Sequence, residues 1–254
     1  MIRIAVLGAG RIGRIHGRNA ASHPDAHLVA VADPHAPSAQ ELAAATGAEV
    51  ASLEEIVERS DVDAILVCTP TTTHADLIER GARAGKAVFC EKPVDLSSAR
   101  IEACLATVEK AGTPLMIGFN RRFDPNFASL RHRLADGEVG EVELVTILSR
   151  DPGPPPVSYI ATSGGLFRDM MIHDLDMARF LLLGDEPVEV ANASGIAADP
   201  VQDFFLERYA QADREELATF LDAVRDGKPC NPTGRDGLMA QRLADAATES
   251  AQSG

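Results

Sequence analysis

The sequence contains no tryptophan and only two tyrosines among its 254 residues, so its hydrophobic core must be largely aliphatic. Basic residues are also scarce, because 24 Lys and Arg stand against 38 Asp and Glu and give a net charge of −14, with no basic block. This charge balance disfavours nucleic acid and anionic membrane surfaces as partners. An anionic ligand would have to be bound by backbone amides and a few placed side chains.

CxxC pairs and long apolar runs are absent as well. The four cysteines lie apart within apolar segments, at Cys68, Cys90, Cys104 and Cys230, which indicates packed, reduced thiols. No apolar segment approaches the roughly 20 residues that a membrane span needs. The first residues, MIRIAVLG, form a strand pattern without a charged leader. We therefore expect a cytoplasmic protein that makes no membrane contact.

The first 120 residues alternate between short β-branched runs and helical patterns. The runs are continuously apolar, which indicates strands covered on both faces, and the helices between them indicate a doubly wound parallel sheet. The predicted strands are residues 2–8, 27–33, 63–70, 86–93 and 114–119, and the predicted helices are 11–22, 38–46, 53–59, 74–84 and 97–111.

This alternation stops near RRFDP (121–125). We therefore predict an α/β fold with a first domain over residues 1–120, a Rossmann doubly wound sheet, and a second α+β domain over 121–254. In the second domain the patterns predict helices at 125–135, 169–180, 204–225 and 235–250, and strands at 141–150 and 187–194.

The run GAGRIG (8–13) fits the pattern G-x-G-x-x-G and stands where a predicted strand ends and a helix begins. In dinucleotide-binding sites the first glycine permits a tight turn, the second lets the backbone approach the pyrophosphate, and the third lets helix pack on strand. The helix N-terminus also offers N–H groups to an anion. We predict that a dinucleotide binds here, at Gly8, Gly10, Arg11, Ile12 and Gly13.

Two further segments end predicted strands at the same edge. Asp33 follows Gly13 by 20 residues. A carboxylate there binds ribose hydroxyls and repels a 2′-phosphate, which favours NAD over NADP, unless Asp33 only starts a turn before Pro34. TPTTTH (69–74) brings Thr69, Pro70 and His74 to the cofactor, or caps the next helix, or does both.

EKP (91–93) ends the strand at 86–93, which places Glu91 and Lys92 at the edge where open α/β sheets bind ligands. From position alone, Lys92 is equally well explained as a surface lysine.

The segment DMMIHDLDMARF (169–180) predicts an amphipathic helix with an unusual polar face. At about 100° per residue the apolar stripe and the polar stripe lie nearly opposite each other. The apolar stripe is Met171, Leu175, Ala178 and Leu182, and the polar stripe is Asp169, His173 and Asp176.

These motifs, with GFNRRFDP (118–125) and GGLFRDMMIHDLDMARFLL (164–182), resemble the Gfo/Idh/MocA oxidoreductase family. The resemblance covers residues 1–200 nearly continuously and resumes at 204–229. The run over 149–180 is similar to the branch of that family that oxidises inositols. This resemblance implies NAD-dependent oxidation of a secondary alcohol of myo-inositol, or of a similar cyclic polyol, to the ketone.

In that family the lysine of EKP and the Asp-x-x-x-His pair are catalytic, which implies Lys92, Asp169 and His173. Histidine, with an unperturbed pKa of about 6.5, can accept the hydroxyl proton. Asp169, one helical turn earlier, can orient the imidazole, and Lys92 can favour the alkoxide. The alternatives are a structural histidine, or a zinc site, which we do not predict because no other His or Cys lies at ligand spacing.

The resemblance also implies that Asn120, Arg121 and Asp151 line the polyol pocket, since a ring of hydroxyls needs several charged and amide partners. Asp176 is expected either to accept a substrate hydroxyl or to orient His173. The alternative for Asp151 is a turn, and for Arg121 a solvated side chain.

The sequence departs from the family in its second domain, where the family has a broad open sheet and only two strands can be identified here. Several strands expected between Pro200 and Val201 have no counterpart. A lone pair of strands is marginal in water, so we expect an uncovered apolar helix face, poor substrate retention and altered assembly. A homo-oligomer is expected if that sheet is complete.

Two other functions are compatible with these patterns. One is an aldose or sugar dehydrogenase of the same family. The other is a non-catalytic NAD-binding protein with a degenerate second domain.

Overall fold

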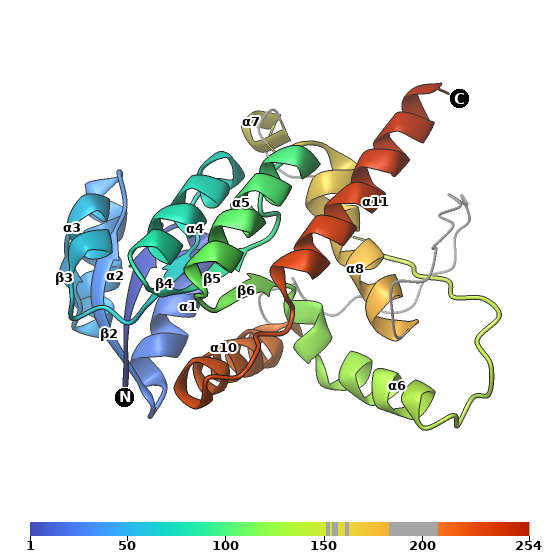
Figure 1. Ribbon diagram of the computed structural model, residues 1–254, viewed down its shortest axis with the longest axis horizontal. Coiled ribbons are helices and arrows are strands. Elements are labelled where there is room, and N and C mark those ends of the chain that lie inside the picture. Colours follow the sequence, from blue (N-terminus) through green and yellow to red (C-terminus); the bar gives the residue numbers. More distant parts are fainter. Residues whose placement is uncertain (151–152, 154–156, 161–162, 183–207, 254) are drawn as a thin grey trace. The chain divides into compact units, whose positions relative to one another are not determined.

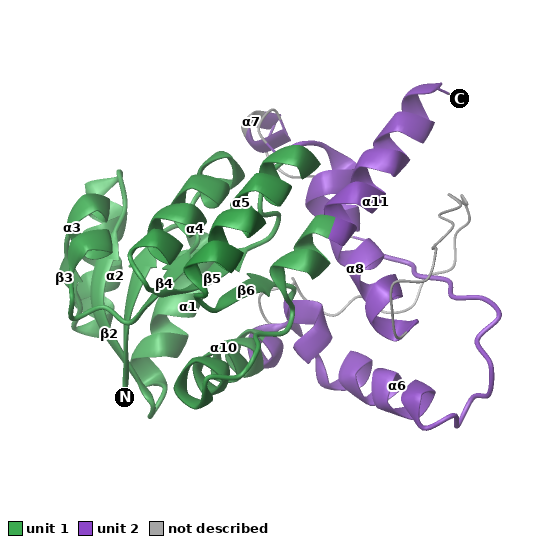
Figure 2. Ribbon diagram, in the orientation of Figure 1, with its two compact units in different colours: residues 1–119, 213–238 green, residues 120–212, 239–254 purple. Residues whose placement is uncertain are grey.

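The computed structural model describes two compact units (Figure 1, Figure 2). Unit 1 comprises residues 1–119 and 213–238, and unit 2 comprises residues 120–212 and 239–254. The residues described are 1–150, 153, 157–160, 163–182 and 208–253.

Unit 1 is built on a six-stranded parallel sheet with the strand order β3-β2-β1-β4-β5-β6. This is the order of a Rossmann sheet, in which ligands bind outside the carboxyl ends of the strands where the strand order reverses. The strands are β1 (Ile2–Leu7), β2 (Ala26–Ala32), β3 (Glu49–Val50), β4 (Ala64–Val67), β5 (Ala87–Glu91) and β6 (Leu115–Gly118).

Helices separate these strands along the chain and cover the sheet (Figure 1). The predicted doubly wound sheet is confirmed, and the sequence missed only the two-residue edge strand β3, which is exposed. The helices are α1 (Arg11–Ser22), α2 (Ala36–Thr46), α3 (Leu53–Glu58), α4 (His74–Arg83) and α5 (Ser98–Ala111), with the short 3-10 helix η1 (Thr71–Thr73) before α4.

Burial explains why these segments form strands. The four residues of β4, AILV, are fully buried, and β6 is buried throughout. Strands covered by helices on both faces need apolar residues at every position, which is why the runs are continuous. Among the described residues the largest buried aromatic side chains are Phe89, Phe119 and Phe220.

Residues 213–238 belong to unit 1, whereas the sequence predicted one second domain over 121–254. The physical reason is the apolar face of α10 (Ala210–Asp226), on which Leu217, Phe220 and Leu221 are buried. The ring of Phe220 meets the ring of Phe89 from β5 edge-on, with centroids 5.9 Å apart. The return of the chain to the sheet is a long-range contact that helical periodicity alone does not predict.

Unit 2 is helical in the part that the structure describes. Its elements are the 3-10 helix η2 (Asn120–Phe123), α6 (Pro125–Ala135), α7 (Val157–Ile160), the π-helix η3 (Phe167–Met171) and α8 (Ile172–Leu181). The last helix, α11 (Gly234–Ser253), contributes its residues from Met239 onward. None of the helices described in the two units is long and apolar enough to cross a membrane.

The strand predicted at 141–150 is wrong, because the structure shows no strand there. A strand needs a neighbouring strand for its backbone hydrogen bonds, and no strand is found among the described residues of unit 2. Leu144 and Leu148 of this segment are 84% and 63% exposed. The other predicted strand, 187–194, lies outside the described residues, as do the Pro200–Val201 junction and residues 204–207.

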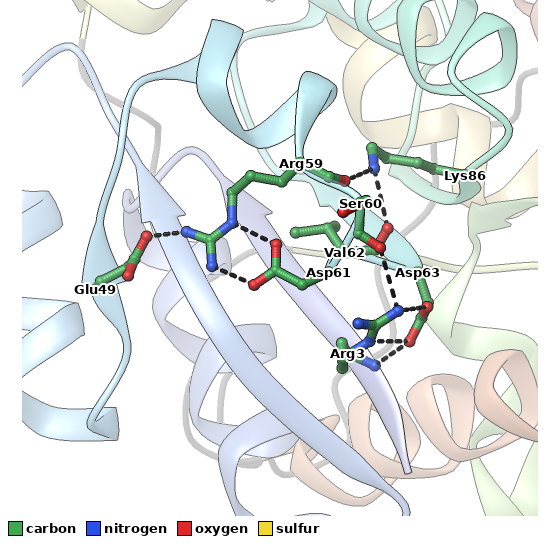
Figure 3. A network of polar contacts seen from close by, with 8 residues as sticks. All are labelled: Arg3, Glu49, Arg59, Ser60, Asp61, Val62, Asp63 and Lys86. Carbon is green, nitrogen blue, oxygen red and sulfur yellow. Dashed lines mark hydrogen bonds and ion pairs between the residues drawn. The ribbon is translucent and has the colours of Figure 1, made fainter.

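A polar network joins the amino ends of the strands in unit 1 (Figure 3). The guanidinium of Arg3 donates to both carboxylate oxygens of Asp63, at 3.0 and 2.6 Å, and the Arg3 N–H donates to the same group at 2.8 Å. Lys86 Nζ donates to the carbonyls of Arg59 (2.6 Å) and Val62 (2.9 Å). The network therefore ties β1 to the residues that precede β4 and β5.

This network makes the stability of the fold depend on pH. The hydrogen bonds from Arg3 lower the pKa of Asp63, and those from Arg59 lower the pKa of Asp61 to about 2. A carboxyl group whose pKa is lower in the folded chain stabilises the fold above its ordinary pKa of 3.8. That contribution is lost as the pH falls through the folded value.

We expect Asp63→Asn to lower the melting temperature at pH 7, and the difference from wild type to shrink as the pH falls below 3.8 and through the lowered pKa of Asp63. Thermal unfolding followed by circular dichroism at several pH values measures this. Asp136→Asn, at an exposed carboxylate of unit 2, is the control. A difference that stays constant across this pH range would show that the Arg3–Asp63 pair has no electrostatic role.

Candidate active site

The glycine loop between β1 and α1 has the geometry that a dinucleotide needs. Gly8 has a φ of +96°, and a Cβ there would lie 2.5 Å from the Cys68 carbonyl oxygen. A Cβ on Gly13 would lie 1.9 Å from the Gly8 carbonyl oxygen. Gly10, by contrast, has open space around it and starts α1 without a side-chain cap. The loop therefore packs tightly on its inner side, where Gly8 and Gly13 approach backbone atoms. Its outer side, with the first N–H groups of α1, is open to a pyrophosphate.

Asp33 follows β2 and contacts this loop directly. The Ala9 N–H donates to Asp33 Oδ2 (2.6 Å), and the His35 N–H donates to Asp33 Oδ1 (2.7 Å). Each carboxylate oxygen has a second lone pair, which can still accept a hydrogen bond from a ribose hydroxyl. Asp33 thus forms the turn that was expected as its alternative role. It also has the position expected of a cofactor-binding carboxylate.

The segment Thr69–His74 follows β4 at the same edge. Thr69 Oγ1 lies 2.7 Å from Thr73 Oγ1, and Pro70 is exposed. His74 is only 2% exposed, and its ring nitrogens lie 2.8 Å from the Pro93 carbonyl and 2.7 Å from the Thr69 carbonyl. Both nitrogens of His74 thus face backbone, so its geometry favours a role in holding loops together.

Lys92 is the first residue after β5, at the carboxyl edge of the sheet, and is half-buried. The preceding side chain, Glu91, turns towards α1, where its Oε1 lies 2.7 Å from Nε2 of the fully buried His16. Glu91, which was expected to bind cofactor, is therefore engaged with a histidine that the sequence analysis did not single out.

The cysteines near this edge are not nucleophiles. Burial raises the pKa of Cys68 and of Cys90 well above the usual value of a thiol, and the negative charge of Glu91 adds to the effect. All four cysteines are buried free thiols, as the sequence predicts.

A cavity of about 730 Å³ in unit 1 lies at the opposite edge of the sheet, at the amino ends of the strands. Arg59, Ser60, Asp63 and Lys86 are among the residues that line it. Arg59, Asp63 and Lys86 there already bond to charged side chains or to backbone carbonyls (Figure 3). This cavity is therefore not the candidate active site.

In unit 2, Asp169 lies in the π-helix η3 and His173 in the first turn of α8. The prediction of one regular helix over 169–180 is wrong for residues 169–171, because the π turn accommodates an extra residue and widens the helix. Such turns occur frequently at functional sites. Tyr159 Oη donates to Asp169 Oδ1 at 2.8 Å, which orients this carboxylate.

Arg121 is part of a polar cluster within unit 2. Its Nη1 binds Asp174 Oδ1 and lies 3.2 Å from Ser149 Oγ, and Ser149 Oγ donates to Asp174 at 2.5 Å. Arg121 is therefore not simply solvated, as its alternative role required. Asn120 lies beside it in η2 and is half-buried, whereas Asp151 lies outside the described residues.

Asp176 is 1% exposed and does not continue the predicted polar stripe. Arg122, itself 8% exposed, donates to both of its oxygens, from Nε at 2.8 Å and from Nη2 at 2.5 Å. A bidentate guanidinium supplies the charge that a buried carboxylate requires, and this allows Asp176 to lie inside. Of the predicted apolar stripe, Leu175 and Ala178 are buried and Met171 and Leu182 are half-buried.

The sequence analysis did not single out several polar residues at these sites, among them His16, Glu216, Arg122 and Asp174. For His16 a signal existed. The buried residues of α1 are Gly13, His16, Gly17 and Ala20, a helical stripe in which a histidine stands among small residues. The other three show no local pattern, because each acquires its partner from a distant segment.

Asp176→Ala separates a packing role from a substrate-binding role. We expect it to lower the free energy of unfolding by about 3–5 kcal/mol, because it breaks a buried ion pair. We expect the double change Arg122→Met/Asp176→Leu to recover most of the loss. Urea denaturation measures both. Unchanged stability together with a raised KM would instead assign Asp176 to the substrate.

Family models match nearly the whole chain. Residues 2–119 match the oxidoreductase family with an NAD-binding Rossmann fold, GFO/IDH/MocA. Residues 127–220 match the GFO/IDH/MocA C-terminal domain, and residues 197–254 match the oxidoreductase family C-terminal alpha/beta domain.

Individual relatives agree with this assignment. The inositol 2-dehydrogenase of Rhizobium meliloti is 42% identical, over 98% of this chain and 96% of the relative. The myo-inositol 2-dehydrogenase of Thermotoga maritima is 36% identical over the same shares. The crystal structure of a myo-inositol dehydrogenase from Corynebacterium glutamicum superposes with a TM-score of 0.89 at 39% identity, covering 100% of this chain and 97% of that chain.

The Rhizobium alignment spans 319 positions, whereas 98% of this chain is about 249 residues, so about 70 positions of the alignment have no residue in this chain. The alignment length does not say where these positions fall, so the loss of strands from the second domain and its place at Pro200–Val201 stay predictions. The matched models and relatives establish the family: this chain belongs to the GFO/IDH/MocA oxidoreductases, as an NAD-dependent enzyme that acts on a CH–OH group.

Proposed function

We propose that this enzyme oxidises a secondary alcohol of myo-inositol, or of a similar cyclic polyol, to the ketone. The observation that carries the proposal is the 42% identity to an inositol 2-dehydrogenase over nearly the full length of both proteins. The tight glycine loop and the Asp33 carboxylate beside it support the cofactor half of the reaction.

The proposed NAD-binding site is formed by residues at the carboxyl edge of the sheet in unit 1. Gly8, Gly10 and Gly13 admit the pyrophosphate to the N-terminus of α1, together with the backbone of Arg11 and Ile12, and Asp33 receives the ribose hydroxyls. Bound NAD supplies the acceptor for the hydride. Thr69 and Pro70 complete this edge, whereas the contacts of His74 and Glu91 favour structural roles.

In the proposed chemistry, His173 accepts the proton of the substrate hydroxyl and Asp169 orients its imidazole and stabilises the charged form. The hydrogen bond from Tyr159 supports this role of Asp169, because it fixes one carboxylate oxygen. Lys92 donates a hydrogen bond to the reacting oxygen as negative charge develops on it. The proposal requires Lys92 and His173 to act on the same hydroxyl group.

The remaining substrate hydroxyls are proposed to bind Asn120, Arg121 and Asp151. The pairing of Arg121 with Asp174 supports a fixed guanidinium, since its Nη1 is held while its other donors can face a hydroxyl. The buried bidentate contact of Asp176 with Arg122 argues against direct contact of Asp176 with substrate.

Two alternatives are distinguished by one assay. An aldose dehydrogenase would form NADH fastest with a sugar, and a non-catalytic protein would bind NADH without any turnover. The expected loss of strands from the second domain favours the non-catalytic alternative, and the presence of Lys92, Asp169 and His173 argues against it. Initial rates of NADH formation over a panel of inositol isomers and common aldoses, with NADH binding by calorimetry, separate the three functions.

We expect Asp33→Asn to raise the Kd for NAD by about 10–10²-fold, because a hydrogen bond to a charged group is worth about 1.5–3 kcal/mol. The same change should improve binding of NADP, since the repelling charge is gone. Asparagine has one acceptor oxygen, so it can keep the contact from the Ala9 N–H but loses the one from the His35 N–H. Asp136→Asn is the control for loss of charge alone, and an unchanged ratio of NAD to NADP affinity would contradict the assignment.

For His173→Ala we expect kcat to fall by about 10²–10⁴, the usual contribution of a general base. The Kd for NADH should stay within about twofold, because His173 is not assigned to the cofactor. His132→Ala, at an exposed histidine of α6, is the matched control. Near-normal turnover of the His173 variant would remove His173 from the mechanism.

A further inference from the structure

We propose that two buried histidines, His16 and His74, position Lys92 by holding the residues on either side of it. The inference rests on the proposed role of Lys92 and extends it to groups that do not touch substrate. All of the residues concerned belong to unit 1.

The first histidine acts on the residue before Lys92. His16 lies on α1 and is fully buried, and its Nε2 is 2.7 Å from Glu91 Oε1 at the end of β5. The imidazole also packs edge-on against the ring of Phe89, with centroids 4.9 Å apart. One face of the Glu91 carboxyl is closed by β6, because a Cβ on Gly118 would come within 3.2 Å of it. The Glu91 side chain is thus confined by α1, β5 and β6.

Glu216 of α10 completes this group. It is fully buried, and one of its carboxylate oxygens, a ring nitrogen of His16 and a carboxylate oxygen of Glu91 all lie within 4.8 Å of one another. Two carboxylates in a low-dielectric site repel each other unless a proton or a cation lies between them. An imidazole that donates to Glu91 relieves this repulsion, which explains why a histidine stands among the small residues of α1.

The second histidine acts on the residue after Lys92. His74, at the start of α4, faces the Pro93 carbonyl at 2.8 Å with Nδ1 and the Thr69 carbonyl at 2.7 Å with Nε2. A carbonyl only accepts, so the ring donates to one of them when neutral and to both when protonated. Burial lowers the pKa of His74, and the two carbonyl contacts oppose this effect. His74 therefore links the end of β4 to the chain just past Lys92.

Together the two contacts restrain the backbone on both sides of Lys92. Glu91 is held through its side chain and Pro93 through its carbonyl. A misplacement of about 1 Å at a reacting group can cost about 10²-fold in rate. His16 and His74 are accordingly positioning residues, and Lys92 is the residue whose position they fix.

The first test needs no turnover. The sequence contains four lysines, Lys86, Lys92, Lys110 and Lys228, so reductive ¹³C-methylation gives few NMR signals, and Lys92→Arg assigns that of Lys92. We expect His16→Leu to shift or broaden the Lys92 signal and to leave that of Lys228, which is 69% exposed, unchanged. His16→Gln, whose amide can still donate to Glu91, should restore it. An unchanged Lys92 signal in folded His16→Leu would overturn the proposal.

The second test is a double-mutant cycle on kcat. In the wild-type background we expect His16→Leu and His74→Leu each to lower kcat by about 10–10²-fold, with the Kd for NADH nearly unchanged. In the Lys92→Met background each should change kcat by less than about twofold, because the group they position is gone. Effects that are equal in both backgrounds would show that the histidines act only on general structure.

Two outcomes separate this inference from the proposed function. If Lys92→Met keeps full polyol turnover, the role of Lys92 fails, whatever the histidine variants do. If Lys92→Met is inactive but the histidine variants are normal, only the positioning role fails. A third outcome would also overturn the positioning role. If the purified protein contains stoichiometric divalent metal that Glu216→Gln loses, then His16, Glu91 and Glu216 form a metal site.

Discussion

The candidate site depends on the close packing of α1 against the sheet. That packing requires glycine at position 13, because a Cβ there would lie 1.9 Å from the Gly8 carbonyl oxygen. The approach places the N-terminus of α1 above the carboxyl ends of β1 and β4, where the strand order reverses. It also carries His16 into contact with Glu91, one residue before Lys92. One steric constraint in the glycine loop therefore determines both the cofactor edge and the surroundings of the proposed catalytic lysine.

The sequence predicts most of unit 1 because its signals are local. Continuous apolar runs identify five of the six strands, and the glycine fingerprint identifies the loop that matters. The role of His16 could not be predicted with the same assurance, since its partner Glu91 is 75 residues away and meets it only when the sheet is assembled. The same holds for α10, whose amphipathic pattern predicts a helix but not the Phe89–Phe220 contact that joins it to unit 1.

In unit 2 the structure differs from the predictions that the sequence pattern makes. Residues 141–150 have the alternation and β-branched content of a strand, yet they form none, because strand formation depends on a neighbour that no local signal supplies. Asp176 was expected on a polar face with Asp169 and His173, but a buried arginine changes which side of α8 can hold a carboxylate. About 70 aligned positions of the Rhizobium relative are absent from this chain. The strand loss expected from the sequence would leave residues 141–150 without a partner strand and their leucines exposed.

The proposed function requires this chain to transfer hydride from a ring carbon of a cyclic polyol to NAD. The most direct measurement uses myo-inositol deuterated at every ring carbon and analyses the reduced cofactor by mass spectrometry. We predict that the NADH formed carries one deuterium and that the polyol becomes a ketone. Reduced cofactor without deuterium, or binding of NAD with no polyol-dependent reduction at all, would contradict it.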